Sequence, residues 1–561
     1  MINILFIFLL FVSIPFTDNK EKSIKDKKGF IVNDTNEINE YIDIYRRAFD
    51  LLIENHADSA NAVQLLKDGI DGMMYNLDPY TRLLEGSSKD NMDILRKGKY
   101  GGVGFSIGVR KRVLTVLSVM EESPSYSEGI NVGDHILMVD SVSTKGLSVK
   151  EAVKLIKGDV GSEVQLNIYR PSIKKNIDFN LTRDNIVVKH VPYWGIDDNN
   201  IGYIRVSKFS RNVSKDFKMA LEEFKKHEGL KGIVVDLRKN SGGLLSSAIK
   251  IVDYFTERGE LILSSKGKTN KSNREWKSRM KPIIPNEMPL AILIDKNSAS
   301  ASEIVSGALQ DLDRAVVIGE KSFGKGLIQH PYDLNDTLTL KITTAKYYLP
   351  SGRLIQTQDY FKEGFLENRG TNNDSLFLSK TGRTLKGGGG ITPDIKINSE
   401  KIPRYVDSIW KSGAFTSFAA EYYAKNPNMK KYSNINTIIL RDFKKYLDKY
   451  SIDFIVDGEI EFKKLEAKLK ETDDYNKDNK LTMGEQLMLN NVNHYFNNIR
   501  NNQFSNNINK KWIKKALMRE FSKVIYGSKE EIKAKLFDDK IYEKAVQVLL
   551  KRKDYNIFLN L

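Results

Sequence analysis

The segment PLAILIDKNSASASEIVSGALQDL, residues 289–312, indicates the fold class of the region around it. It opens on a short apolar run, Leu290 to Ile294, which is typical of a buried strand. A turn of small residues follows, and a helical pattern begins near Ser300. A strand that leads directly into a helix is the repeating unit of α/β proteins, so this segment predicts a sheet layered with helices.

The same alternation continues on both sides of this segment, between residues 200 and 394. Strand-like runs such as GIVVDLR and AVVIGE alternate with helical stretches such as SKDFKMALEEFKKH and LLSSAIKIVDYFTER. Alternation of this kind favours an α/β sheet over separate helical and strand domains. We therefore predict an α/β core over residues 186–400.

The flanking regions differ from this core in pattern. Residues 36–97 show helical periodicity, interrupted by a turn at Asp78-Pro79. Residues 99–184 hold short β-like runs between glycine-rich turns, with one helix, and have the size of a compact domain. Residues 401–561 predict irregular helices with Asn-rich breaks. With 561 residues, the chain is too long for one core, and we predict a multidomain α/β protein.

The N-terminus carries an apolar run, INILFIFLLFVSIPF, at residues 2–16. It is shorter than the ~20 residues that a transmembrane helix needs, and it resembles the apolar part of a secretory signal. We therefore treat residues 1–17 as a signal-like segment and expect export to the periplasm or cell envelope. A helix buried in the fold is the alternative interpretation. Because the run ends without a cysteine, lipoprotein anchoring is excluded.

Composition restricts the chemistry and the partners. The formal net charge is +16, and residues 401–561, with 31 Lys and Arg against 21 Asp and Glu, carry most of it. No nucleic-acid-binding motif accompanies this charge, so we expect no nucleic-acid partner. The helices there could instead serve self-association, an adaptor protein or the membrane surface. The chain has no cysteine and six scattered histidines, so we predict neither a metal site nor a cofactor.

Two familiar motifs occur in the wrong surroundings. Gly104 to Gly108, GFSIG, matches the nucleophile elbow of hydrolases, but another strand follows it where the elbow requires a helix. The stretch GEKSFGKG, residues 319–326, is nearly a phosphate-binding loop. It lacks the following helix and the Ser or Thr that would bind magnesium. We reject both a nucleophile at Ser106 and a nucleotide site at Lys325.

Ser300 and Lys325 are the candidates for covalent catalysis. Ser300 follows a strand and opens a helix, where free amides favour developing negative charge. Lys325 lies between two glycines, and a desolvated amine there could act as a base. Gln329 would share a face with Lys325 in an extended segment and could orient its amine. The alternative is that Ser300 and Glu303 form only a helix-capping box, S-x-x-E.

A second glycine-rich turn could stabilise an oxyanion. In LRKNSGGLLSSA, residues 237–248, glycines again follow an apolar strand and precede a helix. Bare amides at Gly242 or Gly243 suit an oxyanion hole. Together with Ser300 and Lys325, they predict a Ser-Lys nucleophile pair that needs no histidine.

Five blocks in order resemble the C-terminal processing peptidases, the tail-specific serine proteases of family S41. These blocks are GIVVDLRKNSGGLL, NSASASEIVSGALQD, GEKSFGKGLIQ, TTAKYYLPSGRLIQ and GITPD. LDPYTRLL, residues 77–84, is similar to the N-terminal part of that family. The 99–184 region, with GGVGFSIG, is similar to its PDZ domain. The resemblance covers residues 36 to 397 and leaves 401–561 outside.

The resemblance implies a role for each matching residue. Ser300 falls on the nucleophile of the family, Lys325 on the general base, and Gln329 on the Gln that follows it. The oxyanion hole falls on the amides of Ala301 and of one glycine of the Gly242-Gly243 pair. Ser241 stands where the family usually has Pro, which leaves those amides in place but could loosen the turn.

The PDZ resemblance implies capture of a protein C-terminus by strand addition. A glycine-rich loop whose amides gather a terminal carboxylate, next to an open strand edge, would bind such a tail. The expected contact residues are Gly102, Val103, Gly104, Phe105, Ser106 and Ile107. An ordinary β-turn is the alternative for this loop, and Asp134 fits turn chemistry better than binding.

The predicted function is a serine endopeptidase that cleaves proteins near unstructured, apolar C-termini. Two other classes stay open at this point. A catalytically inactive PDZ scaffold or adaptor would share the fold but not the reactive residues. A Ser-His-Asp protease would need a histidine at the nucleophile, and His330, the nearby candidate, alternates to the face opposite Gln329. If the dyad operates, the pKa of Lys325 should lie well below that of an exposed lysine.

Overall fold

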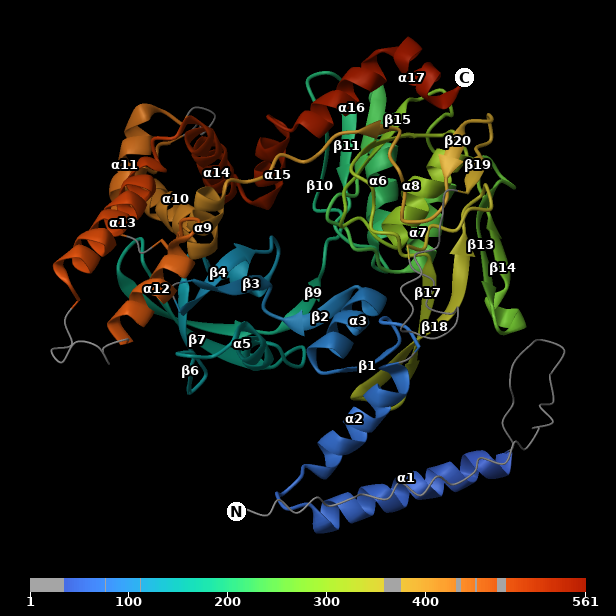
Figure 1. The fold of residues 1–561 in the computed structure, drawn as a ribbon. Helices are drawn as coiled ribbons and strands as arrows, with labels where there is room; N and C mark the ends of the chain where they lie inside the picture. Colours follow the sequence, from blue (N-terminus) through green and yellow to red (C-terminus); the bar gives the residue numbers. More distant parts are fainter. Residues whose placement is uncertain are drawn as a thin grey trace, which may run out of the picture. The chain divides into compact units, whose positions relative to one another are not determined.

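The computed structural model describes residues 35–75, 77–110, 112–357, 375–429, 435–449, 452–471 and 481–561 (Figure 1). These residues fall into two compact units, which divide between Tyr75 and Asn76. The signal-like segment, residues 1–17, lies outside the described residues. Within them, every helix is too short or too polar to cross a bilayer.

The first unit contributes two helices, α1 (Thr35–Asn55) and α2 (Ala62–Tyr75). Both follow the predicted helical periodicity. In the described part of this unit, α1 buries no residue, and α2 buries Met74. Each helix therefore presents apolar side chains to solvent.

A six-stranded sheet forms the centre of the second unit. Its order is β10-β11-β12-β15-β16-β21, with β10 antiparallel and the other strands parallel. Its strands are β10 (Tyr193–Ile196), β11 (Ile201–Arg205), β12 (Gly232–Asp236), β15 (Leu290–Ile294), β16 (Val316–Gly319) and β21 (Ile395–Lys396). β12 and β15 are buried along their whole length, which explains their continuous apolar sequence.

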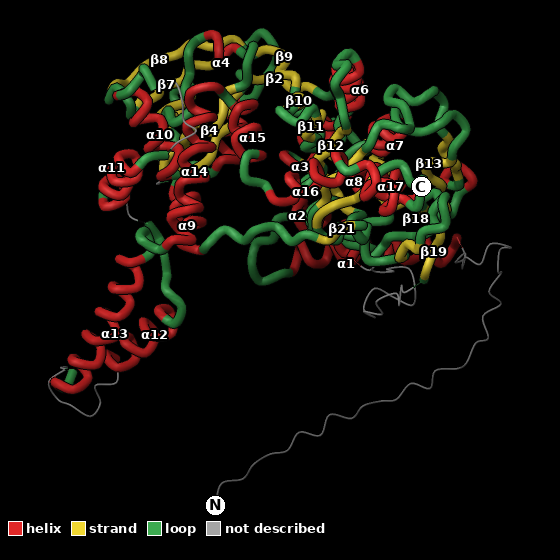
Figure 2. Tube along the Cα trace, turned by 90° about the horizontal axis from the view of Figure 1, so that it is seen from above, coloured by secondary structure: helices red, strands yellow, loops and turns green. Residues whose placement is uncertain are grey.

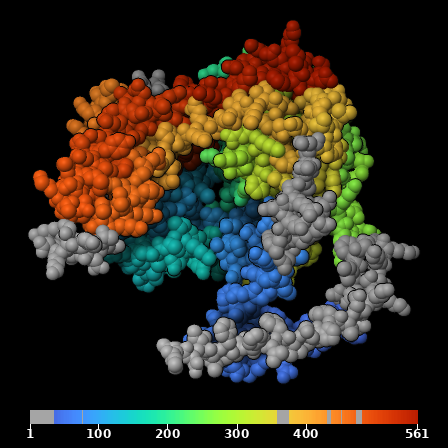
Figure 3. Space-filling model, in the orientation of Figure 1, coloured from blue at the N-terminus to red at the C-terminus, as the bar shows by residue number. Residues whose placement is uncertain are grey.

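Helices cover both faces of this sheet. One face packs against α6 (Val213–Lys225), α7 (Leu245–Asp253) and α8 (Ala301–Asp311). The other face packs against α16 (Lys540–Leu550) and α17 (Arg552–Leu559), which Figure 3 shows in red. The sequence pattern places these last two helices in a separate extension that starts at residue 401. In the structure they complete the α/β core.

An antiparallel sheet adjoins this core. It runs β1-β18-β13-β14, with β17 paired to β18. Its strands are β1 (Arg82–Glu85), β13 (Leu261–Gly267), β14 (Arg274–Lys277), β17 (Leu327–Asp333) and β18 (Leu338–Tyr348). β1 interrupts the 36–97 region, for which the sequence predicted helices alone. It forms a strand because its residues pair with Leu338 to Lys341 of β18. β19 (Leu376–Leu378) and β20 (Thr384–Lys386) make a separate hairpin.

A third sheet belongs to the PDZ-like domain, in the order β3-β4-β5-β7-β8 with β6 beside β5. The strands are β3 (Phe105–Arg110), β4 (Val113–Val119), β5 (His135–Val139), β6 (Val142–Ser143), β7 (Glu163–Arg170) and β8 (Lys175–Thr182). Its helices are α4 (Pro124–Ser127) and α5 (Val149–Ile156). α3 (Ser87–Lys97) precedes the domain, and β2 (Lys99–Gly102) pairs with β9 (Asp184–Val187) to join its two ends.

The helices between residues 404 and 526 form two small cores. One lies among α9 (Arg404–Ser412), α10 (Ala414–Lys425), α11 (Thr437–Asp448) and α14 (Asn507–Tyr526). The other joins α12 (Glu459–Glu471) to α13 (Met483–Asn502), which lie side by side in Figure 2. A further helix, α15 (Ser528–Leu536), leads from α14 to α16. The predicted helical character of the region is confirmed.

Candidate active site

Ser300 lies at the junction of β15 and α8, as the sequence predicted. Its backbone has φ 54° and ψ −113°, in the left-handed half of the map that non-glycine residues rarely adopt. Strain of this kind persists only where the surrounding structure enforces it. Every residue of α8 is buried, so the helix supplies that rigid support.

The buried carboxylate of Glu303 connects Ser300 to the loop that carries Lys325. One oxygen accepts the backbone N–H of Ser300 at 2.7 Å and that of Lys325 at 2.9 Å. The other accepts the N–H of Gly324 at 2.6 Å and the hydroxyl of Ser322 at 2.5 Å. Burial raises the pKa of Glu303, while these hydrogen bonds lower it. The capping interaction therefore does not exclude a reactive pair, because Glu303 binds the backbone N–H groups of both Ser300 and Lys325.

The side chain of Lys325 lies next to that of Gln329, as the sequence predicted. Its Nζ donates a hydrogen bond to Gln329 Oε1 at 2.8 Å and lies 4.3 Å from the centre of the Tyr80 ring. Burial lowers the pKa of Lys325 to about 8, and the nearby Arg82 cation adds to this effect. Asp78 and Glu303 oppose it. The ammonium of Lys325 can therefore lose its proton near neutral pH.

Residues 78–82 lie close to Lys325 and Gln329, which the sequence did not predict. Gln329 Nε2 donates to Thr343 Oγ1 at 3.4 Å, and Thr343 Oγ1 donates to Asp78 Oδ1 at 3.0 Å. Tyr80 and Arg82 come from the same segment as Asp78. The block LDPYTRLL was the available signal, but its spacing does not reveal that it reaches an amine more than two hundred residues away.

Gly242 of the predicted oxyanion turn lies against Ser300, and Gly243 lies against the backbone of Phe209. A Cβ on Gly242 would meet Ser300 Cβ at 2.9 Å and the Ala301 nitrogen at 3.1 Å, so only glycine fits there. The Gly242 N–H itself donates to Asn240 Oδ1 at 2.9 Å. By contrast, the N–H groups of Gly243 and Ala301 have no acceptor within the described chain. Gly243 is therefore the glycine of the pair that can contribute to an oxyanion hole.

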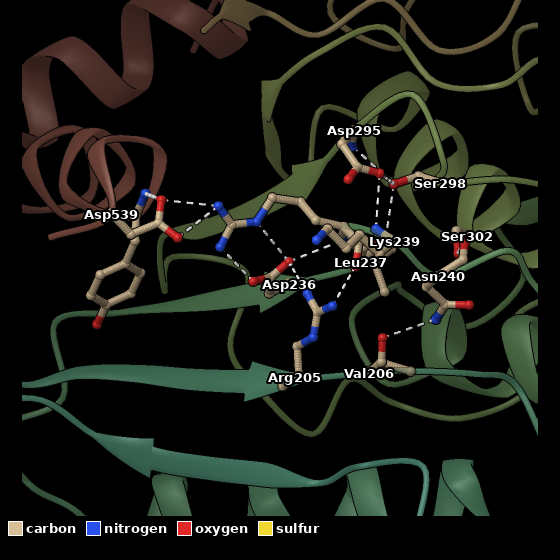
Figure 4. A network of polar contacts seen from close by, with 12 residues as sticks. Arg205, Val206, Asp236, Leu237, Lys239, Asn240, Asp295, Ser298, Ser302 and Asp539 are labelled. Carbon is tan, nitrogen blue, oxygen red and sulfur yellow. Dashed lines mark hydrogen bonds and ion pairs between the residues drawn. The ribbon is translucent and has the colours of Figure 1, made fainter. Parts of the chain in front are cut away.

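Asn240, which precedes this turn, lies near Val206 and Ser302 (Figure 4). Its Nδ2 donates to the carbonyl of Val206 at 3.0 Å, and its own carbonyl accepts the hydroxyl of Ser302 at 2.8 Å. The carbonyl also accepts the N–H of Ala299 at 3.1 Å. Asn240 thus fixes the glycine turn to both sides of Ser300.

The six predicted PDZ residues form one continuous loop and strand. Gly102 ends β2, Gly104 has φ 88°, and Phe105 begins β3. β3 is an edge strand that pairs with β4, so its second edge is open within the described chain. Phe105 and Ile107 pack against the domain core. Ser106 exchanges a 2.5 Å hydrogen bond with Ser118, which confirms that GFSIG is a strand and no nucleophile elbow.

The remaining candidates stay apart from Ser300. β17 and β18 follow Lys325, so the glycine loop there opens no helix. The exposed ring of His330 packs edge-on against Tyr332, with centroids 4.8 Å apart. Asp134 accepts hydrogen bonds from Arg170 and from the N–H of Asn131, which agrees with its predicted turn role. Across the described ranges, no group of three acidic or histidine side chains could hold a metal ion.

Three family comparisons cover most of the second unit. Residues 200–362 match peptidase family S41, and residues 92–169 match the PDZ domain. Residues 405–549 match the C-terminal helical domain of a probable PDZ-protease. The last match covers most of residues 401–561, which lie outside the resemblance found from the sequence.

Two curated relatives agree with these family matches. The carboxy-terminal-processing protease of Bartonella bacilliformis is 36% identical over 52% of this chain and 67% of its own length. The carboxyl-terminal-processing protease of a Synechocystis species is 34% identical over 53% of this chain and 69% of its own. The solved photosystem II D1 C-terminal processing protease aligns at 22% identity over 66% of this chain and 95% of its own, with a TM-score of 0.33.

Proposed function

Since this chain belongs to the carboxy-terminal processing proteases of peptidase family S41, we propose that it cleaves proteins near their apolar C-terminal tails with a Ser300-Lys325 dyad. Membership of the family makes the chain a serine-type peptidase, a hydrolase of peptide bonds. The identity of the reactive residues, the mode of substrate capture and the tail preference belong to the proposal.

In the proposed mechanism, the neutral amine of Lys325 accepts the proton of the Ser300 hydroxyl while Ser300 Oγ attacks the scissile carbonyl carbon. The N–H groups of Ala301 and Gly243 stabilise the oxyanion of the tetrahedral intermediate. The ammonium of Lys325 then gives its proton to the leaving amine as the peptide bond breaks. A water molecule, deprotonated by the same amine, hydrolyses the acyl-enzyme and restores Ser300.

One observation supports the pairing of Ser300 with Lys325. The Glu303 carboxylate accepts the backbone N–H groups of both Ser300 and Lys325 on a single oxygen, at 2.7 and 2.9 Å. Two residues that are 25 positions apart in the sequence are thereby held beside each other. The hydroxyl of Tyr347 reinforces this, because it lies 2.8 Å from the carbonyl of Lys325 and 3.4 Å from that of Ser300.

Substrate capture by the PDZ domain rests on its open strand edge. A tail that adds to the free side of β3 would form main-chain hydrogen bonds along Phe105 to Ile107. Its terminal carboxylate would reach the amides of the Gly102 to Gly104 loop. Removal of the last residues of the substrate, or amidation of its carboxylate, should then weaken binding without affecting the chemical step.

We also propose that the enzyme acts in the periplasm or cell envelope. The support is the apolar run at residues 2–16, which a polar stretch follows. Sequencing the N-terminus of the mature protein tests this, since a start beyond residue 17 would support export and a start at Met1 would contradict cleavage. Self-association, an adaptor or peripheral membrane contact would use the helices of residues 401–561.

The decisive experiment offers the purified protein a substrate with an apolar, unstructured tail. Matched Ser300→Ala and Lys325→Ala variants are assayed beside it. We expect the parent to cleave and both variants to fail while they keep the folded far-ultraviolet circular dichroism spectrum. Unchanged cleavage by Lys325→Ala would reject the dyad. Absence of cleavage by the parent would favour the scaffold alternative.

A further inference from the structure

A small cavity lies on the side of the α/β core away from α6 to α8. It is located between the ends of the central strands and the helices α14 to α16. Its volume is about 170 Å³. Its walls come from the carboxyl ends of β11, β12 and β15, from residues 398–402, and from α14, α15 and the start of α16. In open α/β sheets, the carboxyl ends of the strands are where ligands commonly bind. Figure 4 shows part of the wall, with Arg205, Lys239 and Asp539.

Basic side chains outnumber acidic ones in this wall. The basic residues are Arg205, Arg238, Lys239, Lys515, Arg519, Lys535 and Lys540. The acidic residues are Asp295, Glu400, Asp538 and Asp539. A cavity with low-dielectric walls and an excess of one charge concentrates ions of the opposite sign.

Each acidic group of the wall already has a partner. Asp539 pairs with Arg238 at 2.8 Å, and Asp295 accepts the N–H of Lys239 at 2.9 Å. Lys515 pairs with Asp538 at 2.6 Å and with Glu400 at 3.1 Å, and Lys540 pairs with Glu400 at 2.6 Å. Each carboxylate is therefore already bound to another group, although Asp538 and Asp539 also interact with Arg519 at longer range.

Among the described residues, two cations of the wall form no direct ion pair, although carboxylates near Arg519, led by Glu531 and Asp539, partly offset its charge. Within the described chain, neither Lys535 nor Arg519 forms a hydrogen bond or ion pair with a carboxylate, although the Arg519 guanidinium lies 5.7 Å from the Trp410 ring. The buried Asp236 is near Lys535, but Arg205 and Arg238 each hold it at 2.6 Å. Burial, together with Arg205, Arg238 and Lys239, lowers the pKa of Lys535 to about 8. A charged lysine in these surroundings favours the arrival of an anion.

We propose that this cavity is a binding site for a phosphate-type oxyanion, held by Lys535 and Arg519 with Lys239 at the rim. A doubly charged oxyanion matches two cations that have no ion-pair partner better than the single carboxylate of a peptide terminus does. The planar guanidinium of Arg519 can donate two parallel hydrogen bonds to such a group, and the Lys535 ammonium adds a point charge. The volume accommodates inorganic phosphate or the phosphate of a small monoester.

Inorganic phosphate is the probe for the full-length protein. Thermal unfolding is measured in phosphate and in chloride at matched ionic strength. We expect a saturable rise in Tm of about 2–5 °C at about ten times the Kd. Because phosphate also stabilises proteins by exclusion from their surface, the comparison depends on variants rather than on the rise alone. Lys535→Met should lose the saturable component, and Lys535→Arg should keep it.

Lys533 provides the matched control. It lies on the same helix, its side chain is 64% exposed, and it is absent from the cavity wall. Lys533→Met should keep the phosphate response of the parent. As a direct measure, phosphate should slow acetylation of Lys535 several-fold, read by mass spectrometry, and leave Lys533 unaffected. An equal phosphate response in Lys535→Met, or unprotected acetylation of Lys535 in the parent, would overturn the proposal.

Discussion

Lys325 and Lys535 share one physical property and differ in everything around it. Burial lowers the pKa of each to about 8. Lys325 donates to Gln329, faces Tyr80 and is joined through Glu303 to Ser300. Lys535 lies among arginines and forms no hydrogen bond or ion pair with a carboxylate in the described part of the chain. A depressed lysine pKa therefore indicates burial, and the neighbouring groups decide whether the amine serves as a base or as an anion ligand.

The largest expected difference between the two lysines is in catalysis. Lys325→Ala should lower kcat/KM by about 10³-fold or more, because removal of a general base from a nucleophile pair has effects of this order. Lys535→Ala should change kcat/KM by less than about twofold. Both are measured with one tailed peptide and with phosphate absent. Similar losses in the two variants would remove the distinction.

The next difference is in the pH dependence of kcat/KM. The base must be neutral, so activity should rise as pH increases and level off above the Lys325 pKa of about 8. The Arg82 cation lowers that pKa, so Arg82→Gln should move the inflection to higher pH and reduce activity at pH 7 several-fold. Lys535→Met should leave the inflection in place. An unmoved inflection in Arg82→Gln would contradict the electrostatic role of residues 78–82.

Tyr80 should act in the opposite direction to Arg82. Its ring lies 4.3 Å from Lys325 Nζ and favours the charged amine. Tyr80→Leu should therefore shift the pH inflection downward and, through looser positioning, lower the plateau of kcat about threefold to tenfold. Tyr80→Phe keeps the ring and is the control. The same upward shift in Tyr80→Leu and Arg82→Gln would argue for a general structural disturbance instead.

The smallest effect concerns stability. Because the pKa of Lys535 is lower in the folded chain than in the unfolded chain, the unfolded state binds more protons between pH 8 and 10.5. The contribution of Lys535 to the free energy of unfolding should rise over that window and be least favourable below pH 8. Lys535→Met should therefore raise Tm by a few degrees at pH 7, with the gain fading toward pH 10. A gain that is constant with pH would point to packing alone.

Much of the architecture was predictable because the core segments carry strong local patterns. The β15-to-α8 unit, the glycine turn after β12 and the strands after Lys325 all follow from apolar runs, small residues and missing helix signals. These patterns also placed Ser300, Lys325 and Gln329 in one region. The pairing of Lys325 with Gln329 needed only the periodicity of an extended segment.

The parts that escaped prediction depend on contacts between distant segments. β1 exists because Arg82 to Glu85 pair with β18, and four residues carry too little pattern to show this. The choice of Gly243 over Gly242 depends on where the Asn240 side chain points, which no spacing reveals. The burial of α16 and α17 against the sheet likewise follows from tertiary packing, since their sequence resembles that of the helices before them.

That last packing has a consequence for how the enzyme is made. The ribosome completes β11, β12, β15 and β16 long before it adds residues 540–559, so one apolar face of the sheet stays uncovered during translation. Ser300 sits at the end of a strand in that same sheet. A nascent chain should therefore contain Ser300 and α8 while the opposite face of their sheet is still uncovered, and we expect full proteolytic activity only after α16 and α17 dock.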